Sequence, residues 1–410
     1  MCYNKHMKLQ EKLKQAVGQK AAKVANKMKN GELIVALDIG TEYIKALAAT
    51  SSQKMEILAA AKVKQAAGNM HNGAVADIRG VISAVEKAVL EIERQTGERA
   101  TKTVVGIAGE LVRGETRRVV YKRPDADARI TEAEMSKIVR AVELRALQRA
   151  QKEAALDTGT QLKLRLINSA LVSIEIDGYK VNSPIDFQGS EVAVQIYTAF
   201  APLVHIGAVE KIAHELELEL ISIATEPFAV YRAAIGDDES NNLTAILVDI
   251  GGGTTDLAVV NEGGVEGTKS FAIGGRSFTR EIARKLDMQL DAAEDLKRSD
   301  LPEDIEKVDS AIQDNLLVWR SGVELLLETF TGLDHLPSKV LLSGGGAGLP
   351  AIKATLDDEA FGEDLALTKH PAVQVLGFDQ LPGIKNRSTL ELDTSFITAA
   401  GMLWVGRDSL

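Results

Sequence analysis

The chain has 410 residues but only one cysteine, Cys2, and six histidines. A single cysteine excludes an intramolecular disulfide framework and a cysteine-rich metal site. The histidines are scattered and show no ligand spacing such as HExxH. No stretch approaches the roughly 18 to 20 uninterrupted apolar residues that span a bilayer, and no signal peptide is visible. These absences favour a cytosolic protein.

Most of the chain also lacks an excess of basic residues. The net charge is −10, but residues 1–30 contain eight lysines and one glutamate, a local balance of +7, which leaves about −17 for the remainder. An acidic body argues against general nucleic-acid binding, which needs a basic surface. In residues 1–30 apolar side chains recur every three or four positions among the lysines, which predicts an amphipathic helix suited to an anionic membrane surface. The alternative is a solvated N-terminal helix.

Two segments about half the chain apart repeat one pattern. They are LIVALDIGTEYIKALAAT, residues 33–50, and LTAILVDIGGGTTDLAVV, residues 243–260. Each is an apolar strand that ends in Asp-Ile-Gly, followed by a turn, a second apolar strand and a further β-prone run. A repeated unit in a chain of this length predicts two similar domains that face each other, each presenting an acidic, glycine-bearing turn.

Turns of this kind are suited to binding phosphate, because glycine lets backbone N–H groups approach oxygen atoms closely. In the first turn we expect the backbone amides of Gly40, Thr41 and Glu42 to bind phosphate oxygens. Lys45 is expected to reach the phosphate as a point charge. In the second turn the same role is expected of Gly251, Gly252, Gly253, Thr254 and Thr255. One such turn alone would favour an ordinary hairpin, but a matched pair favours a phosphate clamp.

The strands that precede the two turns end in carboxylates at matching positions. Asp38 and Asp249 are expected to hold Mg²⁺ through water, since this ion keeps much of its hydration shell. The copies differ one strand later, where Lys45 of the first corresponds to Asp256 of the second. This predicts a first copy that binds phosphate more and a second copy that contributes more to metal and water.

Two further glycine turns follow the second copy. SGGGAGLP, residues 343–350, contains Gly344, Gly345 and Gly346 and could lie flat against a planar base or ribose, although such turns are common. Gly274 and Gly275 precede a helix N-terminus, a natural position for an anion.

These motifs resemble, in their order, the five nucleotide motifs of the actin, Hsp70 and sugar-kinase superfamily. The corresponding segments are residues 38–45 (phosphate-1), 224–236 (connect-1), 249–256 (phosphate-2), 343–350 (adenosine) and 398–403 (connect-2). The resemblance implies two actin-like (RNase H-like) α/β domains with a central cleft that binds ATP and Mg²⁺. It also implies that Glu226 orients the attacking water beside Asp249, and that Glu294 and Lys297 touch ribose and adenine. The alternative for Glu226 is a plain helix-start carboxylate before Pro227.

Within the superfamily the chain resembles FtsA, a bacterial cell-division actin homologue, over residues 68–89, 102–114 and 183–189. The pattern strand-helix-strand-strand over residues 101–199, with the long helix at 130–156, resembles the small α+β (SHS2-type) subdomain inserted in that family. The expected division is a basic segment at 1–30, domain I at 31–100 and 200–236 with a C-terminal helix at 391–410, the insert at 101–199, and domain II at 237–390.

The FtsA resemblance implies a weak ATPase that organises or tethers an FtsZ-type ring, associates with itself into filaments and works on the inner face of the plasma membrane. The family usually binds membrane through a C-terminal helix, and here residues 1–30 are the candidate membrane-binding segment, with a solvated helix as the alternative. Three alternatives stay open: a PilM-like scaffold of a pilus or secretion platform, a small-molecule kinase, and a binding module that does not hydrolyse ATP. No sugar-kinase substrate motif is evident.

Overall fold

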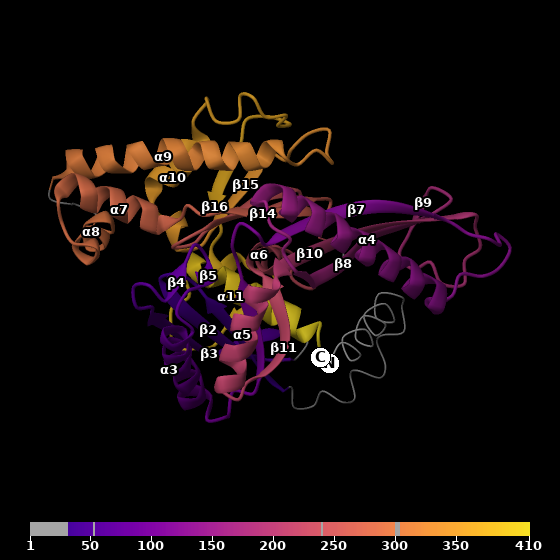
Figure 1. The fold of residues 1–410 in the computed structure, drawn as a ribbon, viewed down its shortest axis with the longest axis horizontal. Helices are drawn as coiled ribbons and strands as arrows, with labels where there is room; N and C mark the ends of the chain where they lie inside the picture. The colour runs from indigo at the N-terminus through magenta and orange to yellow at the C-terminus, as the bar shows by residue number, and fades with distance from the viewer. Residues whose placement is uncertain (1–31, 52–53, 239–240, 300–303) are drawn as a thin grey trace.

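The computed structural model describes residues 32–51, 54–238, 241–299 and 304–410. The predicted amphipathic helix in residues 1–30 lies outside the described residues. Figure 1 shows two α/β bodies stacked on each other, with a β-rich arm projecting from one side. The lower body contains the first sequence repeat and the upper body the second.

The first repeat forms one half of a six-stranded sheet with the order β11-β6-β1-β2-β3-β17. Strands β1 (Leu33–Ile39), β2 (Tyr43–Thr50) and β3 (Met55–Lys64) are the three predicted strands, joined in antiparallel pairs. Strands β6 (Lys102–Ile107) and β11 (Glu219–Thr225) add in parallel. The short β17 (Ile384–Asn386) completes the far edge.

Both faces of this sheet are covered, which explains why its strands read as continuous apolar runs. Val35 and Leu37 of β1 face a core shared with helices α3 (Ile78–Thr96) and α5 (Leu203–Glu215). Ile34 and Ala36, one position out of phase, face a core shared with α6 (Glu226–Ile235) and α11 (Ile397–Arg407). The alternation follows from the two-residue period of a strand.

The second repeat forms β12 (Ala245–Ile250), β13 (Thr255–Asn261) and β14 (Gly264–Phe271), again antiparallel. Strands β15 (Lys339–Ser343) and β16 (Ala372–Val375) add in parallel. Helices α7 (Gly275–Leu286) and α9 (Ile305–Glu328) cover one face around the buried Trp319. The other face packs on α6, and α6 packs on α11, which lies against the first sheet, so these two helices lie between the two sheets.

The arm consists of β7 (Arg113–Lys122), α4 (Glu132–Thr158), β8 (Leu164–Ile176), β9 (Tyr179–Val181) and β10 (Glu191–Pro202). Its strands continue the second sheet, in the order β16-β15-β12-β13-β14-β7-β10-β8-β9. The join is short, because β14 pairs with β7 only at Gly267 with Glu115 and at Thr268 with Gly114. Figure 1 shows α4 lying along the arm.

The structure corrects one predicted boundary. The strand expected over residues 101–109 to begin the insert is β6, which pairs in parallel with β1 and so belongs to the first sheet. The first strand of the arm is instead β7, whose sequence RGETRRVVYK is charged and mostly exposed and gave no apolar signal. The insert therefore begins after Ile107.

The remaining elements are short. They are β4 (Met70–His71), β5 (Ala74–Val75), α8 (Leu290–Lys297), η1 (Gly345–Gly348), α10 (Pro350–Asp357), η2 (Phe378–Gln380) and η3 (Thr394–Phe396). Within the described ranges, no helix has both the length and the apolar character needed to cross a membrane.

Candidate functional site

The two repeated turns have the same local geometry. Residue Asp38 lies opposite Lys45 in the β1–β2 hairpin, and Asp249 lies opposite Asp256 at the same register of β12–β13. Each turn is closed by one backbone hydrogen bond, 3.2 Å from Gly40 N to the Tyr43 carbonyl and, in the second turn, 2.9 Å from Gly251 N to the Thr254 carbonyl. The duplication inferred from the sequence is therefore present in the backbone as well.

In the first hairpin the opposed pair carries opposite charges. The Lys45 ammonium lies 2.5 Å from the buried Asp38 carboxylate and donates to the carbonyl of Ser395 at 2.8 Å. Burial lowers the pKa of Lys45, but attraction to Asp38, Asp249 and Glu226 outweighs it and leaves the pKa raised. Lys45, predicted to reach a phosphate, is thus held by Asp38 as a charged group.

In the second hairpin the Asp249 carboxylate is surrounded by hydroxyl groups instead of cations. Ser343 donates to one of its oxygens at 2.9 Å and Thr398, from α11, to the other at 2.8 Å. Burial raises the pKa of Asp249, although Lys45 and the two hydroxyls oppose the shift. Asp249 is therefore tied both to β15 and to the C-terminal helix.

Asp256, the counterpart of Lys45, is almost completely buried beside Asp249. It accepts hydrogen bonds from Thr254, at 3.0 Å, and from Ser270. Burial, together with repulsion by Asp249 and Asp38, raises the pKa of Asp256 to about 7. From the sequence, this carboxyl was identified as the counterpart of Lys45, in the copy expected to contribute more to metal and water.

Glu226 is the first residue of α6 and faces the same acidic cluster. Burial raises its pKa well above the ordinary value, and repulsion by Asp38, Asp256 and Asp249 adds to the effect. The structure thus brings Glu226 together with the carboxylates of both hairpins. Its position before Pro227 fits both the predicted role and that of a helix-start residue.

The two turns touch each other across the gap between the sheets. A Cβ atom placed on Gly252 would lie 2.6 Å from Cγ of Glu42, and one on Gly253 would lie 2.5 Å from Oγ1 of Thr41. Only glycine permits so close an approach at these two positions. The predicted phosphate-binding residues are therefore brought together, with each turn packed against the other.

The start of α7 does not offer the free anion site predicted at Gly274 and Gly275. The N–H of Gly275 donates to the carbonyl of Gly251, and the N–H of Arg276 to that of Gly252, both at 2.8 Å. These bonds satisfy amides that a helix N-terminus normally leaves open. They fix α7 to the second turn instead of facing an anion.

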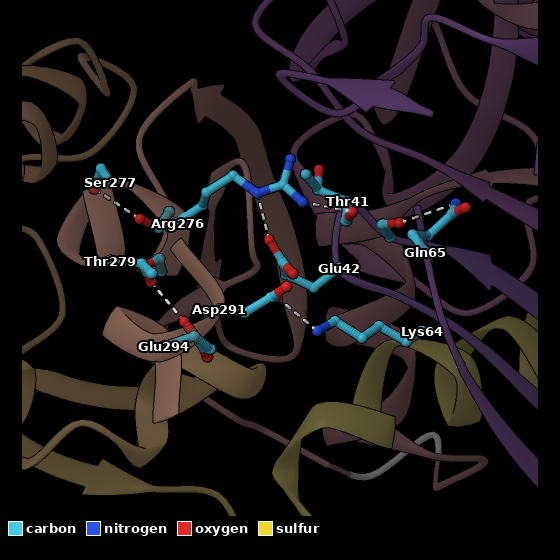
Figure 2. Close-up of polar contacts among 12 residues, drawn as sticks. Thr41, Glu42, Lys64, Gln65, Arg276, Ser277, Thr279, Asp291 and Glu294 are labelled. Atoms are coloured by element: carbon cyan, nitrogen blue, oxygen red, sulfur yellow. Dashed lines mark hydrogen bonds and ion pairs between the residues drawn. The ribbon is translucent and has the colours of Figure 1, made fainter. Parts of the chain in front are cut away.

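Side chains of α7 and α8 lie next to the two turns (Figure 2). Glu294 accepts from Thr279 at 2.5 Å and from Lys297 at 2.7 Å. Lys297 also donates to the carbonyl of Gly275 at 3.1 Å. Burial alone would raise the pKa of Glu294, but attraction to Lys297 and the hydrogen bonds that Glu294 accepts leave it lowered. The two residues predicted to touch a nucleoside are thus neighbours next to the second turn.

The third glycine turn lies against the second hairpin. Gly344 has a φ of 85°, and a Cβ there would lie 2.4 Å from the carbonyl oxygen of Ile250 and 2.5 Å from Oδ1 of Asp249. Gly345 and Gly346 begin the short helix η1 that follows.

Thr255, predicted to bind phosphate at the second turn, instead has its hydroxyl in the protein interior, where it donates to the Ile273 carbonyl at 2.7 Å and accepts from Trp319. The Thr255 hydroxyl therefore belongs to the core of the second domain.

The charged side chains of this site are partly suited to binding a hydrated cation together with an anionic ligand. Asp38, Asp249 and Glu226 all attract Lys45, while Asp256 is repelled by Asp249 and Asp38, so added positive charge would relieve the repulsion among these carboxylates. Among the described residues, no three Asp, Glu, His or Cys side chains are grouped to hold a metal directly. A Mg²⁺ held through water, as predicted for Asp38 and Asp249, is the arrangement that these carboxylates fit.

Several residues of the site were not assigned a role from the sequence. Ser270, Ser343 and Thr398 are hydroxyl donors to the buried carboxylates, and only Ser343 and Thr398 lie inside predicted motifs. Arg276 directly follows the Gly274-Gly275 pair, and its guanidinium binds Glu42 and the Thr41 carbonyl. A charged residue at the second position of a helix next to a glycine pair was the one available hint.

Comparison with known proteins agrees with this geometry. The family model for cell division protein FtsA matches residues 246–387, and that for MreB/Mbl protein matches residues 180–292. Cell division protein FtsA of Pseudomonas aeruginosa is 26% identical over 274 residues, 66% of this chain and 61% of that protein. FtsA of Bacillus subtilis is 24% identical over 360 residues, 81% of this chain and 77% of that protein.

Solved structures show the same architecture. The PilM-PilN type IV pilus biogenesis complex aligns with a TM-score of 0.65 at 18% identity, covering 91% of this chain and 98% of that one. Ethanolamine utilization protein EutJ from Carboxydothermus hydrogenoformans aligns with a TM-score of 0.50 at 17% identity, covering 97% and 98%. At these identities the likeness concerns the fold alone.

The duplicated hairpins, the two sheets and the helices between them define a two-domain α/β protein with the actin-like fold, as predicted. Within that class the chain is similar to cell division protein FtsA.

Proposed function

We propose that this protein binds ATP with Mg²⁺ in the cleft between its two sheets and hydrolyses it slowly. The observation that carries the proposal is the pair of identically registered turns, Asp38–Lys45 and Asp249–Asp256, which meet around a buried cluster with an excess of carboxylates. Such a cluster is costly unless a cation or protons neutralise it. The FtsA and MreB/Mbl matches add support, since these are actin-like proteins.

Each named residue has a task in this proposal. Asp38 and Asp249 would hold the water shell of the metal, and Lys45 fixes the position of the Asp38 carboxylate through their ion pair. Ser343 and Thr398 fix the orientation of Asp249 by donating to both of its oxygens. Bound Mg²⁺ supplies electrostatic stabilisation of the phosphate oxygens.

Glu226 positions water. In the ligand-free protein burial and three neighbouring carboxylates raise its pKa well above the ordinary value, so it tends to hold a proton. Positive charge entering the cleft lowers that pKa, and the ionised carboxylate of Glu226 can then accept a hydrogen bond from water. Glu294 and Lys297 lie beside the second turn, where they would flank the nucleoside.

We place the protein in bacterial cell division, where it would organise or tether an FtsZ-type ring at the membrane and associate with itself into filaments. The support is its likeness to cell division protein FtsA in several bacteria. ATP binding would set the angle between the domains and hence the state of the polymer. Contact with the membrane is proposed to come from residues 1–30.

One second candidate has specific support. The fold aligns with a protein of the PilM-PilN complex over nearly the whole length of both chains. The corresponding function is a scaffold for a pilus or secretion platform that binds a peptide of a membrane partner. Direct comparison of an FtsZ C-terminal peptide with a PilN-type N-terminal peptide, by fluorescence anisotropy on the full chain, separates the two candidates.

Nucleotide binding is tested by calorimetry with ATP, with and without Mg²⁺. The wild type should bind only with Mg²⁺, and Asp249→Asn should bind at least tenfold more weakly, since it loses a charge next to the metal. Glu226→Gln should bind normally but turn over more slowly. Normal binding by Asp249→Asn, or unchanged turnover by Glu226→Gln, would remove these residues from the proposed roles.

The membrane part of the proposal is tested separately. Sedimentation with anionic lipid vesicles compares the full chain with a chain that begins at Gly31. The full chain should pellet with the vesicles and the shorter one should stay in solution. Equal pelleting of the two would rule out residues 1–30 as the anchor.

A further inference from the structure

An ion pair joins the two domains beside the paired turns. Arg276, the second residue of α7 in the upper domain, donates Nε–H to the carboxylate of Glu42, in the turn between β1 and β2 of the lower domain. Its other nitrogen donates to the carbonyl of Thr41 at 3.3 Å. Figure 2 shows the Arg276 side chain extended across the gap toward Glu42. One side chain therefore connects the second domain to both the side chain and the backbone of the first turn.

The surroundings make this pair stronger than an ordinary surface pair. The side chains of Arg276 and Glu42 are only 18% and 28% exposed. The Glu42 side chain also packs on Gly252 of the opposite turn. Partial burial reduces screening by water, so closing this contact fixes the relative position of the two turns.

A second ion pair crosses the same gap and provides an internal comparison. Lys64, at the end of β3, lies 3.0 Å from Asp291 of α8. These side chains are 59% and 88% exposed. Exposed pairs contribute little because water screens the attraction and two long side chains must be ordered. The Lys64–Asp291 pair is thus a matched control for the Glu42–Arg276 pair.

The position of Glu42 conflicts with phosphate binding at the first turn. A carboxylate there repels a polyphosphate, while a guanidinium binds carboxylate and phosphate oxygens with the same planar array of N–H groups. A polyphosphate carries more negative charge than the carboxylate and so competes with it for Arg276. Breaking the pair also frees Glu42 to move away from Gly252, which separates the turns.

We propose that the Glu42–Arg276 pair is a latch that holds the two domains together in the ligand-free protein, and that Arg276 exchanges Glu42 for the polyphosphate of a bound nucleotide. The latch itself depends only on the observed contacts. The exchange rests on the proposed nucleotide-binding function. Arg276 thereby becomes a phosphate ligand whose availability depends on the domain angle.

The latch is tested without nucleotide by measuring the distance between spin labels. Cys2 is replaced by serine, and cysteines that carry the labels are introduced at two exposed positions, Leu90 of α3 and Leu317 of α9. The distance between the labels then reports on the relative position of the two domains. Glu42→Gln should broaden the distance distribution and move it to longer values, whereas Lys64→Gln should leave it unchanged. A distribution for Glu42→Gln identical to that of the wild type would overturn the latch, whatever the nucleotide results.

The exchange is tested by calorimetry with inorganic tripolyphosphate and with ATP, both with Mg²⁺. Glu42→Gln and Arg276→Gln both lack the latch and differ in whether the arginine is present. Glu42→Gln should bind several-fold more tightly than the wild type, and Arg276→Gln about tenfold more weakly than Glu42→Gln, as expected for the loss of one charge-assisted contact. Lys64→Gln should stay within about twofold of the wild type.

The failures of the two proposals can be told apart. Equal affinity of Glu42→Gln and Arg276→Gln overturns the exchange while leaving nucleotide binding intact. If the wild type binds neither ATP nor tripolyphosphate, the proposed function and the exchange are both overturned. The spin-label distances alone then decide whether the latch exists. The circular dichroism spectrum and the unfolding midpoint of each variant confirm that it is folded.

Discussion

In the first hairpin Asp38 faces Lys45 as an ion pair at 2.5 Å, whereas in the second hairpin Asp249 faces Asp256 at the same register. The first copy is balanced by its own cation. The second copy places two carboxylates on neighbouring strands and satisfies them with four hydroxyls, from Ser343, Thr398, Ser270 and Thr254. One backbone design therefore supports two solutions to the burial of an acidic group.

The difference shows which of the two hairpins can change its charge. Although burial lowers the pKa of Lys45, attraction to Asp38 and the neighbouring carboxylates leaves it raised, so this lysine stays charged over the physiological range. A carboxyl held by hydroxyls, with a pKa raised to about 7, can gain or lose a proton near neutrality. The first copy is electrostatically fixed, and the second responds to protons or cations.

The largest effect is expected from breaking the ion pair of the first copy. Asp38→Ala leaves the mostly buried Lys45 without its carboxylate, which should lower the free energy of unfolding by about 3 kcal/mol. Urea denaturation followed by circular dichroism measures the change. The double variant Asp38→Ala/Lys45→Met should recover part of the loss. A loss below about 0.5 kcal/mol for Asp38→Ala would show that the pair is not a structural element.

The next effect concerns the pH response of the second copy. The folded protein keeps a proton on Asp256 up to about pH 7, whereas an unfolded chain releases it near pH 4. Its stabilising contribution is therefore present below about pH 4 and is lost as the pH rises through 7.

Asp256→Asn removes this response. Between about pH 4 and 7 its free energy of unfolding should rise relative to the wild type, with a slope of at most about 1.4 kcal/mol per pH unit. Denaturation curves at several pH values measure the slope, with the exposed Asp295→Asn as control. Parallel curves for wild type and Asp256→Asn would contradict the titration.

A smaller effect is expected from removing one hydroxyl of the second copy. Thr398→Val keeps the shape of the side chain but leaves one oxygen of Asp249 without its donor, which should cost about 1 to 2 kcal/mol. The loss should shrink at low pH, where protonation of Asp249 reduces the need for donors. Thermal unfolding at neutral and acidic pH measures both values, and an equal loss at the two would argue against a charged Asp249.

The smallest effect tests why the turns differ in side chains. Thr41 and Glu42 of the first turn correspond to Gly252 and Gly253 of the second. Gly253→Ala places a methyl group 2.5 Å from the Thr41 hydroxyl oxygen, so the turns must separate slightly, at a cost of about 1 kcal/mol. Combining it with Thr41→Ala should relieve the clash. A cost unaffected by Thr41→Ala would place the strain elsewhere.

Local patterns predicted the repeated units well. The strands β1, β2, β12 and β13 begin and end within about two residues of their expected positions, because uninterrupted apolar runs flank each glycine turn. The long helix predicted at residues 130–156 is α4 (Glu132–Thr158), whose ends also fall within two residues of the prediction. Thr131 caps its N-terminus by accepting a hydrogen bond from the N–H of Glu134 at 3.2 Å.

Long-range pairing could not be predicted in the same way. Strand β6 was assigned to the insert because it is next to it in sequence, but parallel pairing with β1 decides its sheet. Around the two hairpins the motif positions were identified, yet the hydrogen-bonding roles of Arg276, Ser270 and Thr398, which come from three other elements, were not. Hydroxyls and surface arginines have no spacing rule, so which of them reach a buried carboxylate depends on how the sheets come together.

The short join between β14 and β7 has a mechanical consequence. The chain enters the arm from β6 and leaves it into α5, both in the lower domain, but the arm joins the sheet of the upper domain through backbone pairing at two residue pairs. Side-chain hydrogen bonds from Thr116 to the Val265 carbonyl and between Tyr197 and Thr268 support this join. If the two domains rotate apart, these few bonds must either break or move the arm together with the upper domain. A small rotation near Gly267 becomes a large displacement at β9, the distant end of the sheet.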